Sequence, residues 1–170
     1  IPEEIASKFN ESIIIPEGGY HPLGAAGASL IMYKLVNCNA THICTAIGTA
    51  TTLAGLLLKS KANERIIGIP VLKNMLDIEE RLVHLGCRHQ LSNMDILDGY
   101  HWGGYAKKSP LLIQFMNSFF SIHGIPTDFV YTAKMMYAVI DQIKNGFFAE
   151  GSRIVCLHTG GLQGNDSLPA

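Results

Sequence analysis

The sequence alternates between two kinds of apolar periodicity along most of its 170 residues. Short runs that suit strands are followed by longer segments in which apolar residues recur every three or four positions, as on one face of a helix. We expect strands at 12–15, 42–47, 65–71, 94–97, 129–131 and 153–158. We expect helices at 24–36, 52–59, 75–85, 110–122 and 132–144. Three of these helices are followed by a glycine that can end a helix, namely Gly86, Gly124 and Gly146.

This order of elements predicts the fold class. Strands that alternate with helices are joined by right-handed crossovers, which produce an open, mostly parallel sheet with helices on both faces. A chain of this length with 48% hydrophobic residues can bury one sizeable core. The sequence contains no internal repeat and no flexible linker. We therefore expect residues 1–170 to form a single α/β domain.

Composition narrows the class of partner. The 13 basic and 14 acidic residues leave a net charge of −1, and no long run of either sign occurs. Such a chain lacks the basic surface that nucleic acid or an anionic membrane requires. Its apolar runs are far shorter than the ~20 residues of a membrane span. We expect a cytoplasmic protein that binds a small molecule, with no nucleic-acid or membrane partner.

The cysteines predict neither a disulfide framework nor a metal site. The four of them, at positions 38, 44, 87 and 156, are widely spaced, which favours free thiols in a reducing compartment. His42 with Cys44, and Cys87 with His89, could each offer two metal ligands. Neither pair has the CxxC or HxxxH spacing of a zinc site, so we expect no bound metal.

Ligands of open parallel sheets bind beyond the carboxyl ends of the strands, so the turns that lead from strand to helix are the candidate sites. Turns of this kind that carry glycine or hydroxyl residues lie at 16–22, 48–52, 131–134 and 158–161. The turn at 48–52 is the most informative. It has the sequence Gly-Thr-Ala-Thr-Thr and directly precedes an expected helix.

This turn has the chemistry of an anion-binding site. Gly48 permits a sharp bend, after which backbone N–H groups and the hydroxyls of Thr49, Thr51 and Thr52 lie at the positive end of a helix. No lysine is present, and the pattern is not that of a Walker loop. Neutral donors suit a phosphate that is held as an anchor, whereas a transferred phosphate usually requires Lys, Arg and Mg²⁺. An ordinary threonine N-cap explains the turn equally well.

Five motifs occur in a fixed order along the chain. They are Ile15–Gly19 with His21–Gly24, Gly48–Gly55, Gly103–Tyr105, Asp128–Lys134 and Leu157–Gly161. Together they resemble the carboxyl-terminal half of the 1-aminocyclopropane-1-carboxylate deaminase and D-cysteine desulfhydrase family. Members of that family are pyridoxal 5′-phosphate enzymes with a fold of type II, like tryptophan synthase β. The resemblance implies that 1–170 is the larger, carboxyl-terminal α/β domain of a longer two-domain enzyme.

The resemblance also implies roles for single residues. Thr49, Ala50, Thr51 and Thr52 match the loop that binds the cofactor phosphate in the family. Tyr131 and Tyr105 match tyrosines that face the cofactor and substrate and are therefore catalytic candidates, although Ala106 replaces the glycine that usually follows. Gly19, in the Gly18-Gly19 pair, would let the backbone approach the cofactor ring or the substrate. Without the motifs, both tyrosines could equally be ordinary aromatic residues at a strand end and in a loop.

Two threonines indicate a branch of the family. The electron withdrawal by pyridoxal phosphate depends on the group that faces its ring nitrogen. The cyclopropane-opening deaminases typically have Glu and Leu where this sequence has Thr132 and Thr159. The pattern therefore resembles the D-cysteine desulfhydrase branch, which converts D-cysteine to pyruvate, ammonia and sulfide. Thr159 is the preferred partner of the ring nitrogen, with Thr132 close by. The alternative role for both threonines is that of hydroxyls that cap a turn or a helix. The alternative substrate is 1-aminocyclopropane-1-carboxylate.

Other residues on these turns favour structural roles. Lys134 matches a lysine of the family motif, but its place in the first turn of a helix favours a structural lysine over one that binds the cofactor covalently. His21 and His158 lie on promising turns, yet a histidine that caps a turn is the preferred interpretation for both.

The family supplies its covalent lysine from a Gly-Asn-Lys motif and grips the substrate carboxylate with a Ser-Asn-Gln loop. Neither motif occurs in this sequence, which begins with Ile1. We therefore expect a fragment of a longer enzyme that by itself holds at most a phosphate or a weakly bound cofactor.

Three hypotheses follow. The first is a pyridoxal-phosphate-dependent lyase or deaminase that acts on a small amino acid and is represented here by its carboxyl-terminal part. The second is a non-catalytic α/β module that binds a phosphorylated metabolite. The third is an interaction domain whose apolar helix at 110–122, with Phe115, Phe119 and Phe120, forms a dimer interface. The ordered motifs favour the first, and we expect a homodimer, although no residue pattern directly indicates the oligomeric state.

Overall fold

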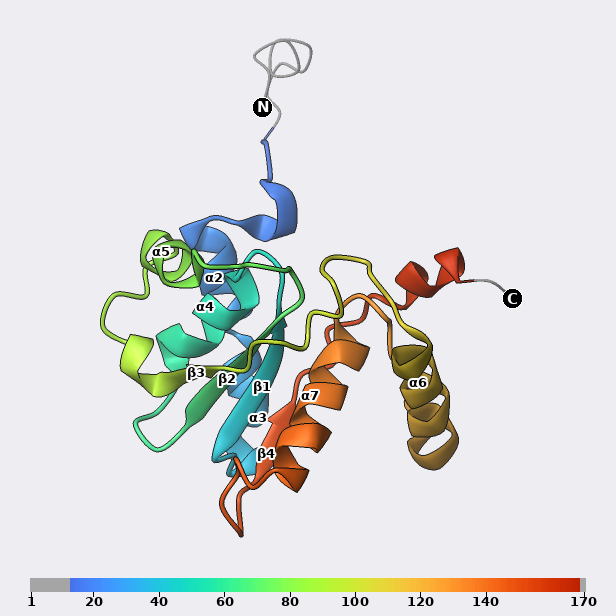
Figure 1. The fold of residues 1–170 in the computed structure, drawn as a ribbon. Helices are drawn as coiled ribbons and strands as arrows, with labels where there is room; N and C mark the ends of the chain where they lie inside the picture. The colour runs from blue at the N-terminus through green and yellow to red at the C-terminus, as the bar shows by residue number, and fades with distance from the viewer. Residues whose placement is uncertain (1–12, 169–170) are drawn as a thin grey trace.

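The computed structural model describes residues 13–168. In this part of the chain a single parallel sheet has the strand order β3-β2-β1-β4. The strands are β1 (His42–Ile47), β2 (Arg65–Pro70), β3 (Met94–Ile96) and β4 (Ile154–Cys156). Figure 1 shows the sheet between two groups of helices. The structure thus confirms the predicted α/β class, the parallel sheet and the helices on both faces.

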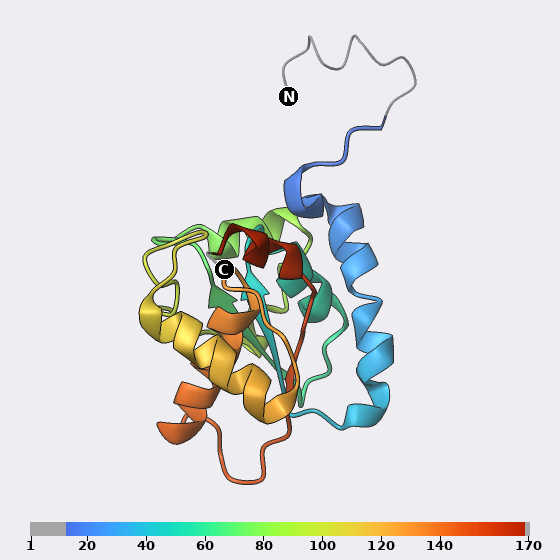
Figure 2. The same cartoon turned by 90° about the vertical axis from the view of Figure 1, so that its right-hand side faces the viewer.

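The helices agree with most of the expected segments. They are α2 (Pro22–Ala28), α3 (Ile31–Leu35), α4 (Thr51–Lys59), α5 (Ile78–His84), α6 (Pro110–His123) and α7 (Thr132–Lys144). Short 3₁₀ turns are η1 (Glu17–Gly19), η2 (Val36–Cys38), η3 (Leu91–Asn93) and η4 (Leu162–Ser167). Figure 2 shows α2 and α3 following one another along one side of the molecule, opposite α6.

Both faces of the sheet are buried, as expected for parallel strands covered by helices. In β1, Ile43 and Ile47 point into a core shared with α4 and α5, whereas Cys44 points into a second core shared with α7. Full burial of an isoleucine side chain contributes about 1.5–3 kcal/mol. This alternation within β1 ties helices on opposite sides of the sheet to the same strand.

Helix α2 lies directly against α4. A β-carbon at Gly55 of α4 would lie 2.6 Å from the β-carbon of Ala28, so only glycine permits this approach. The close packing holds η1 and α2 beside the beginning of α4. This arrangement matters because the beginning of α4 is part of the site described below.

Two predicted helices are shorter than expected. The segment 24–36 bends at Ser29, whose hydroxyl donates a hydrogen bond to the Ala26 carbonyl at 2.7 Å, and divides into α2 and α3. The segment 75–85 becomes helical only at Ile78, because Asp77 takes the non-helical conformation of an N-cap residue. Helix α6, by contrast, ends at Gly124, whose φ of 68° confirms its role as a helix stop.

The predicted strand at 129–131 is wrong. These residues form a turn into α7, because the buried carboxylate of Asp128 accepts hydrogen bonds from the backbone N–H groups of Val130, Tyr131 and Thr132. Backbone groups used in this way cannot pair in a sheet. Of the predicted strand at 12–15, residue 12 lies outside the described residues and 13–15 form no strand.

The remaining expectations concern cysteines, phenylalanines and helix length. Cys38, Cys44, Cys87 and Cys156 are free thiols. Within the described residues no group of three or more His, Cys, Asp or Glu side chains is placed to hold a metal ion. None of the helices in the described range is long and apolar enough to cross a membrane. In α6, Phe115 and Phe119 pack against each other with ring centroids 5.6 Å apart, and Phe120 is exposed.

Candidate functional site

A cavity of about 670 Å³ lies at the carboxyl end of the sheet. The strand order reverses direction between β1 and β4, because β2 and β3 follow on one side of β1 and β4 lies on the other. Ligands of open α/β sheets bind at such a switch point. The turn after β1 (48–52) and the turn after β4 (159–161) line this cavity, so topology and cavity agree.

The turn after β1 leaves the start of α4 without a cap. Ala50 occupies the N-cap position with a left-handed backbone (φ 71°, ψ 3°), and no side-chain hydrogen bond caps the first helical turn. The threonine N-cap that the sequence allowed is therefore not formed. The first N–H groups of an uncapped helix point at whatever lies before it, together with the positive end of the helix dipole. Thr51 and Thr52, the first residues of α4, line the cavity.

Two hydroxyls lie together in this turn. The Oγ1 atoms of Thr49 and Thr51 are 3.0 Å apart, and the Thr49 hydroxyl also reaches the Gly18 carbonyl at 3.4 Å. Gly18 has a φ of 59°, and a β-carbon there would lie 2.6 Å from the Thr49 side chain. The Gly18 backbone therefore closes one side of the turn. The left-handed Ala50 is the kind of backbone strain that gathers at ligand sites.

Tyr131 is positioned by the turn that precedes α7. The Asp128 carboxylate, which is fully buried, accepts the Tyr131 N–H at 2.7 Å and the Thr132 N–H at 2.9 Å. This holds the Tyr131 backbone in place, and its ring extends toward the turn after β1. Tyr131 thereby joins two segments that are far apart in the sequence.

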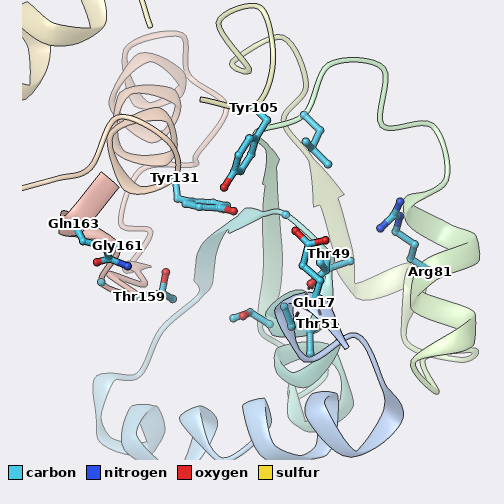
Figure 3. A pocket seen from close by; sticks show the side chains of 16 residues that line it. Glu17, Thr49, Thr51, Arg81, Tyr105, Tyr131, Thr159, Gly161 and Gln163 are labelled. Carbon is cyan, nitrogen blue, oxygen red and sulfur yellow. Dashed lines mark hydrogen bonds between the residues drawn. The ribbon is translucent and has the colours of Figure 1, made fainter. Parts of the chain in front are cut away.

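Tyr105 comes from the loop between β3 and α6 and faces Tyr131. Their ring centroids are 6.0 Å apart and the rings are inclined by 71°. Figure 3 shows both hydroxyls directed into the cavity above Thr49. Burial, followed by the neighbouring Tyr105 phenol, raises the pKa of Tyr131 above its ordinary value of 10.0. Tyr131 is therefore a protonated hydrogen-bond donor at neutral pH.

Thr159 lies on the side of the cavity formed by the turn after β4. The next two residues, Gly160 and Gly161, have φ of 89° and 88°, which an L side chain rarely adopts. A β-carbon at Gly161 would lie 3.3 Å from the Asp128 carboxylate, so this turn approaches the one that positions Tyr131. His158 caps it, because its Nδ1 accepts the Gly160 N–H at 3.3 Å.

The structure brings most of the predicted site residues to one cavity. Those that line it are Thr49, Ala50, Thr51, Thr52, Tyr105, Tyr131 and Thr159. Gly19 is not among the lining residues, and its neighbour Gly18 is. Thr132 is also absent from the lining. It is fully buried, and its hydroxyl donates to Asp128 Oδ2 at 2.6 Å and accepts the Asp128 N–H at 2.8 Å.

The structural interpretation of three other residues is confirmed. His21 caps α2, because its Nδ1 accepts the Leu23 N–H at 3.1 Å. His158 caps its turn as described above. Lys134 is fully buried and binds two backbone carbonyls. Each of these side chains is thus engaged with the backbone.

Sequence reasoning missed two charged residues on the cavity wall, Glu17 and Arg81. Arg81 comes from α5, where its Nε donates to Asp77 at 2.8 Å and its guanidinium lies 5.6 Å from the centre of the Tyr20 ring. Figure 3 shows Arg81 on the side of the cavity opposite Thr159. The turn after β1 is uncharged, as the sequence indicates, but the surrounding wall is not. No local sequence pattern connects α5 with that turn.

The arrangement supports a defined chemistry. One end of the cavity offers uncapped amides and hydroxyls to an anion, and the other offers two phenols that can donate, accept or stack. Thr159 adds a hydroxyl from the side formed by the turn after β4. A ligand with a phosphate at one end and a reactive polar ring at the other fits these donors.

Comparisons with known proteins agree with the resemblance seen in the sequence motifs. No protein-family model matches the chain. A provisionally named 1-aminocyclopropane-1-carboxylate (ACC) deaminase of Pyrococcus horikoshii is 31% identical, over 96% of this chain and 54% of its own. An ACC deaminase of a Bradyrhizobium species is 28% identical, over 71% of this chain and 39% of its own. A crystal structure of an ACC deaminase homologue has a TM-score of 0.80 and 26% identity, over 96% of this chain and 53% of its own.

The fold and the site define an α/β unit with an uncapped helix terminus at the switch point of its sheet. The chain belongs to the family of ACC deaminase and its homologues, as the sequence motifs predicted. It spans about half the length of the curated relatives that it matches.

Proposed function

We propose that this chain is the cofactor-anchoring part of a pyridoxal-phosphate-dependent lyase or deaminase that acts on a small amino acid. The observation that carries the proposal is the uncapped start of α4 at Ala50, in the same cavity as the phenols of Tyr105 and Tyr131. The relatives named as ACC deaminases support the same class of enzyme.

The residues fit the shape of pyridoxal phosphate. The backbone N–H groups and hydroxyls at 49–52 would hold the phosphate, which is fully ionised or nearly so at neutral pH and is stabilised by a helix N-terminus. Thr159 would present its hydroxyl to the ring nitrogen. Thr132 cannot present its own in the observed conformation, because Asp128 engages it from both sides.

The cofactor, when bound, supplies the electron withdrawal that weakens bonds at the α-carbon of an amino acid. The chain's own contribution is positioning and proton control. Tyr131 holds a protonated phenol against the cavity, where it can donate to a carboxylate or a leaving group. Tyr105 is more exposed than Tyr131 and faces it, so it would offer a second phenol to the substrate.

We propose D-cysteine as the substrate, with pyruvate, ammonia and sulfide as products. Support comes from the hydroxyl of Thr159 in the cavity, because a hydroxyl that faces the ring nitrogen can leave it neutral, whereas a carboxylate keeps it protonated. ACC is the alternative substrate. It is favoured by the relatives that are named ACC deaminases.

The experiment is to express the complete gene product that contains these residues, record its visible absorbance, and assay pyruvate from D-cysteine and 2-oxobutanoate from ACC. We expect the absorbance of lysine-bound pyridoxal phosphate and pyruvate from D-cysteine. A colourless product would contradict the proposed class of enzyme. A coloured protein that forms 2-oxobutanoate from ACC but no pyruvate from D-cysteine would leave the class intact and exclude the D-cysteine assignment.

A further inference from the structure

Lys134 is a fully buried lysine that binds the backbone of another segment. Its Nζ donates to the carbonyl oxygen of His101 at 2.9 Å and to that of Gly104 at 2.8 Å. A buried ammonium is costly unless it is hydrogen-bonded. These two bonds therefore connect α7 to the loop between β3 and α6.

The loop that receives Lys134 has an unusual backbone. Five of its residues have positive φ, namely Gly99 (90°), Trp102 (56°), Gly103 (97°), Gly104 (125°) and Ala106 (51°). The left-handed conformation is unfavourable for residues with a side chain, such as Trp102 and Ala106. Backbone of this kind persists only where its surroundings hold it. The carbonyls that Lys134 binds lie within this strained stretch.

Tyr105 immediately follows Gly104 and lines the cavity. Tyr131 lies three positions before Lys134, at the start of the same helix. One helical turn of α7 therefore carries one cavity phenol and, through the Lys134 ammonium, holds the backbone that carries the other. The centroids of the two tyrosine rings lie 6.0 Å apart.

We propose that Lys134 is a positioning residue, whose ammonium holds the loop at 101–104 so that Tyr105 faces Tyr131 across the cavity. The importance of Tyr105 for catalysis rests on the proposed function, but the loop-holding role of Lys134 does not. A purely structural lysine would stabilise the loop and the sheet to the same extent. A positioning lysine stabilises the loop more than the sheet.

The test compares Lys134→Met with a matched control on the same helix, Lys144→Met, which changes an exposed lysine in the last turn of α7. Amide hydrogen exchange is measured on the chain without ligand. The Gly104 and Lys107 amides are hydrogen-bonded within the loop and report its closed state. Loss of a charged hydrogen-bond donor should lower their protection about tenfold or more. Protection in β1 should fall by less.

Trp102 provides an independent signal, because it is the only tryptophan of the 170 residues. Lys134→Met should increase quenching of its fluorescence by acrylamide, and Lys144→Met should leave quenching unchanged. Equal losses of protection in β1 and in the loop, or unchanged quenching, would overturn the proposal.

Should Lys134→Met fail to fold, the unmodified chain still decides the question. The Lys134 ammonium hydrogens, observed by ¹⁵N NMR, should exchange with water more slowly than those of Lys144. Equally fast exchange would overturn the loop-holding role.

The effect on catalysis is tested in the complete gene product. If Lys134 acts through Tyr105, then Lys134→Met and Tyr105→Phe should each lower kcat, and the double variant should lose no more than the worse single variant. Additive losses would contradict action through Tyr105. An inactive or colourless parent protein would contradict the proposed function instead, and the exchange data on the ligand-free chain would stand.

Discussion

The ring of Tyr131 lies directly against Gly48, the residue that follows β1 and begins the turn at 48–52. A β-carbon at Gly48 would lie 3.2 Å from Cε1 of Tyr131 and 3.5 Å from its hydroxyl oxygen. The absence of a side chain at Gly48 therefore sets how closely the phenol approaches the turn. The end of the cavity with the amides and hydroxyls meets the end with the phenols at this contact.

Gly48→Ala should displace the Tyr131 ring and weaken binding of pyridoxal phosphate. Overpacking of a tight contact costs about 1–3 kcal/mol, which corresponds to about fivefold or more in Kd. Gly27→Ala is the matched control, because a β-carbon at Gly27 of α2 would meet no atom within 4 Å. Binding is measured by isothermal titration calorimetry. An unchanged Kd for Gly48→Ala would show that this contact does not limit the site.

Thr51→Val and Thr52→Val should weaken binding of pyridoxal phosphate but not of pyridoxal, which lacks the phosphate. A hydrogen bond to a charged group is worth about 1.5–3 kcal/mol, so each change should raise the Kd about tenfold or more where the hydroxyl contacts the phosphate. Thr41→Val, just before the opposite end of β1, controls for the loss of a threonine hydroxyl. Equal losses for the two ligands would place the threonines away from the phosphate.

Asp128→Ala should destabilise the fold by about 2–4 kcal/mol, because it removes the acceptor of three backbone N–H groups and of the Thr132 hydroxyl. Urea unfolding followed by circular dichroism measures the change. Asp98→Ala alters an exposed carboxylate and should stay within about 0.5 kcal/mol. Similar losses for both variants would mean that the Asp128 hydrogen bonds contribute little to stability.

The stability difference between the unmodified chain and Lys134→Met should depend on pH. Burial lowers the pKa of Lys134 from 10.5 to about 8, and the opposing attraction of Asp128 is smaller. Between these values the unfolded chain binds more protons than the folded chain, so the stability of the unmodified chain should rise with pH relative to the variant. The rise should be about 1–3 kcal/mol between pH 8 and 10.5. Urea unfolding at several pH values measures it, and a flat difference would contradict the burial of the charge.

Local sequence predicted most elements, because their signals are local. Helix α7 occupies the predicted residues, and β1, β2 and β3 match their runs to within a residue. The failure at 129–131 has a local but polar cause, since the carboxylate of the adjacent Asp128 takes the N–H groups that a strand would use. Apolar periodicity carries no information about such a side-chain acceptor.

The site shows the same division. The residues of the turn at 48–52 indicate which donors it can offer. They do not indicate whether a threonine caps the following helix or leaves its first N–H groups open to an anion. That choice depends on the left-handed Ala50 and on the contact of Gly18 with Thr49. Likewise, the family resemblance places both Thr159 and Thr132 near the cofactor ring nitrogen. In the structure only Thr159 lines the cavity, because the Thr132 hydroxyl is bonded to Asp128.

The sequence by itself determined the α/β class, the family and the neutral character of the anion-binding turn, because strand and helix periods and short motifs are properties of adjacent residues. Only the tertiary structure decided that Tyr105 faces Tyr131, that Glu17 and Arg81 border the cavity, and that Lys134 holds a loop from another part of the chain. The reason is that the strand order brings these distant segments to one end of the sheet. The buried ammonium of Lys134 is hydrogen-bonded by carbonyls of His101 and Gly104, which only the tertiary fold places beside it.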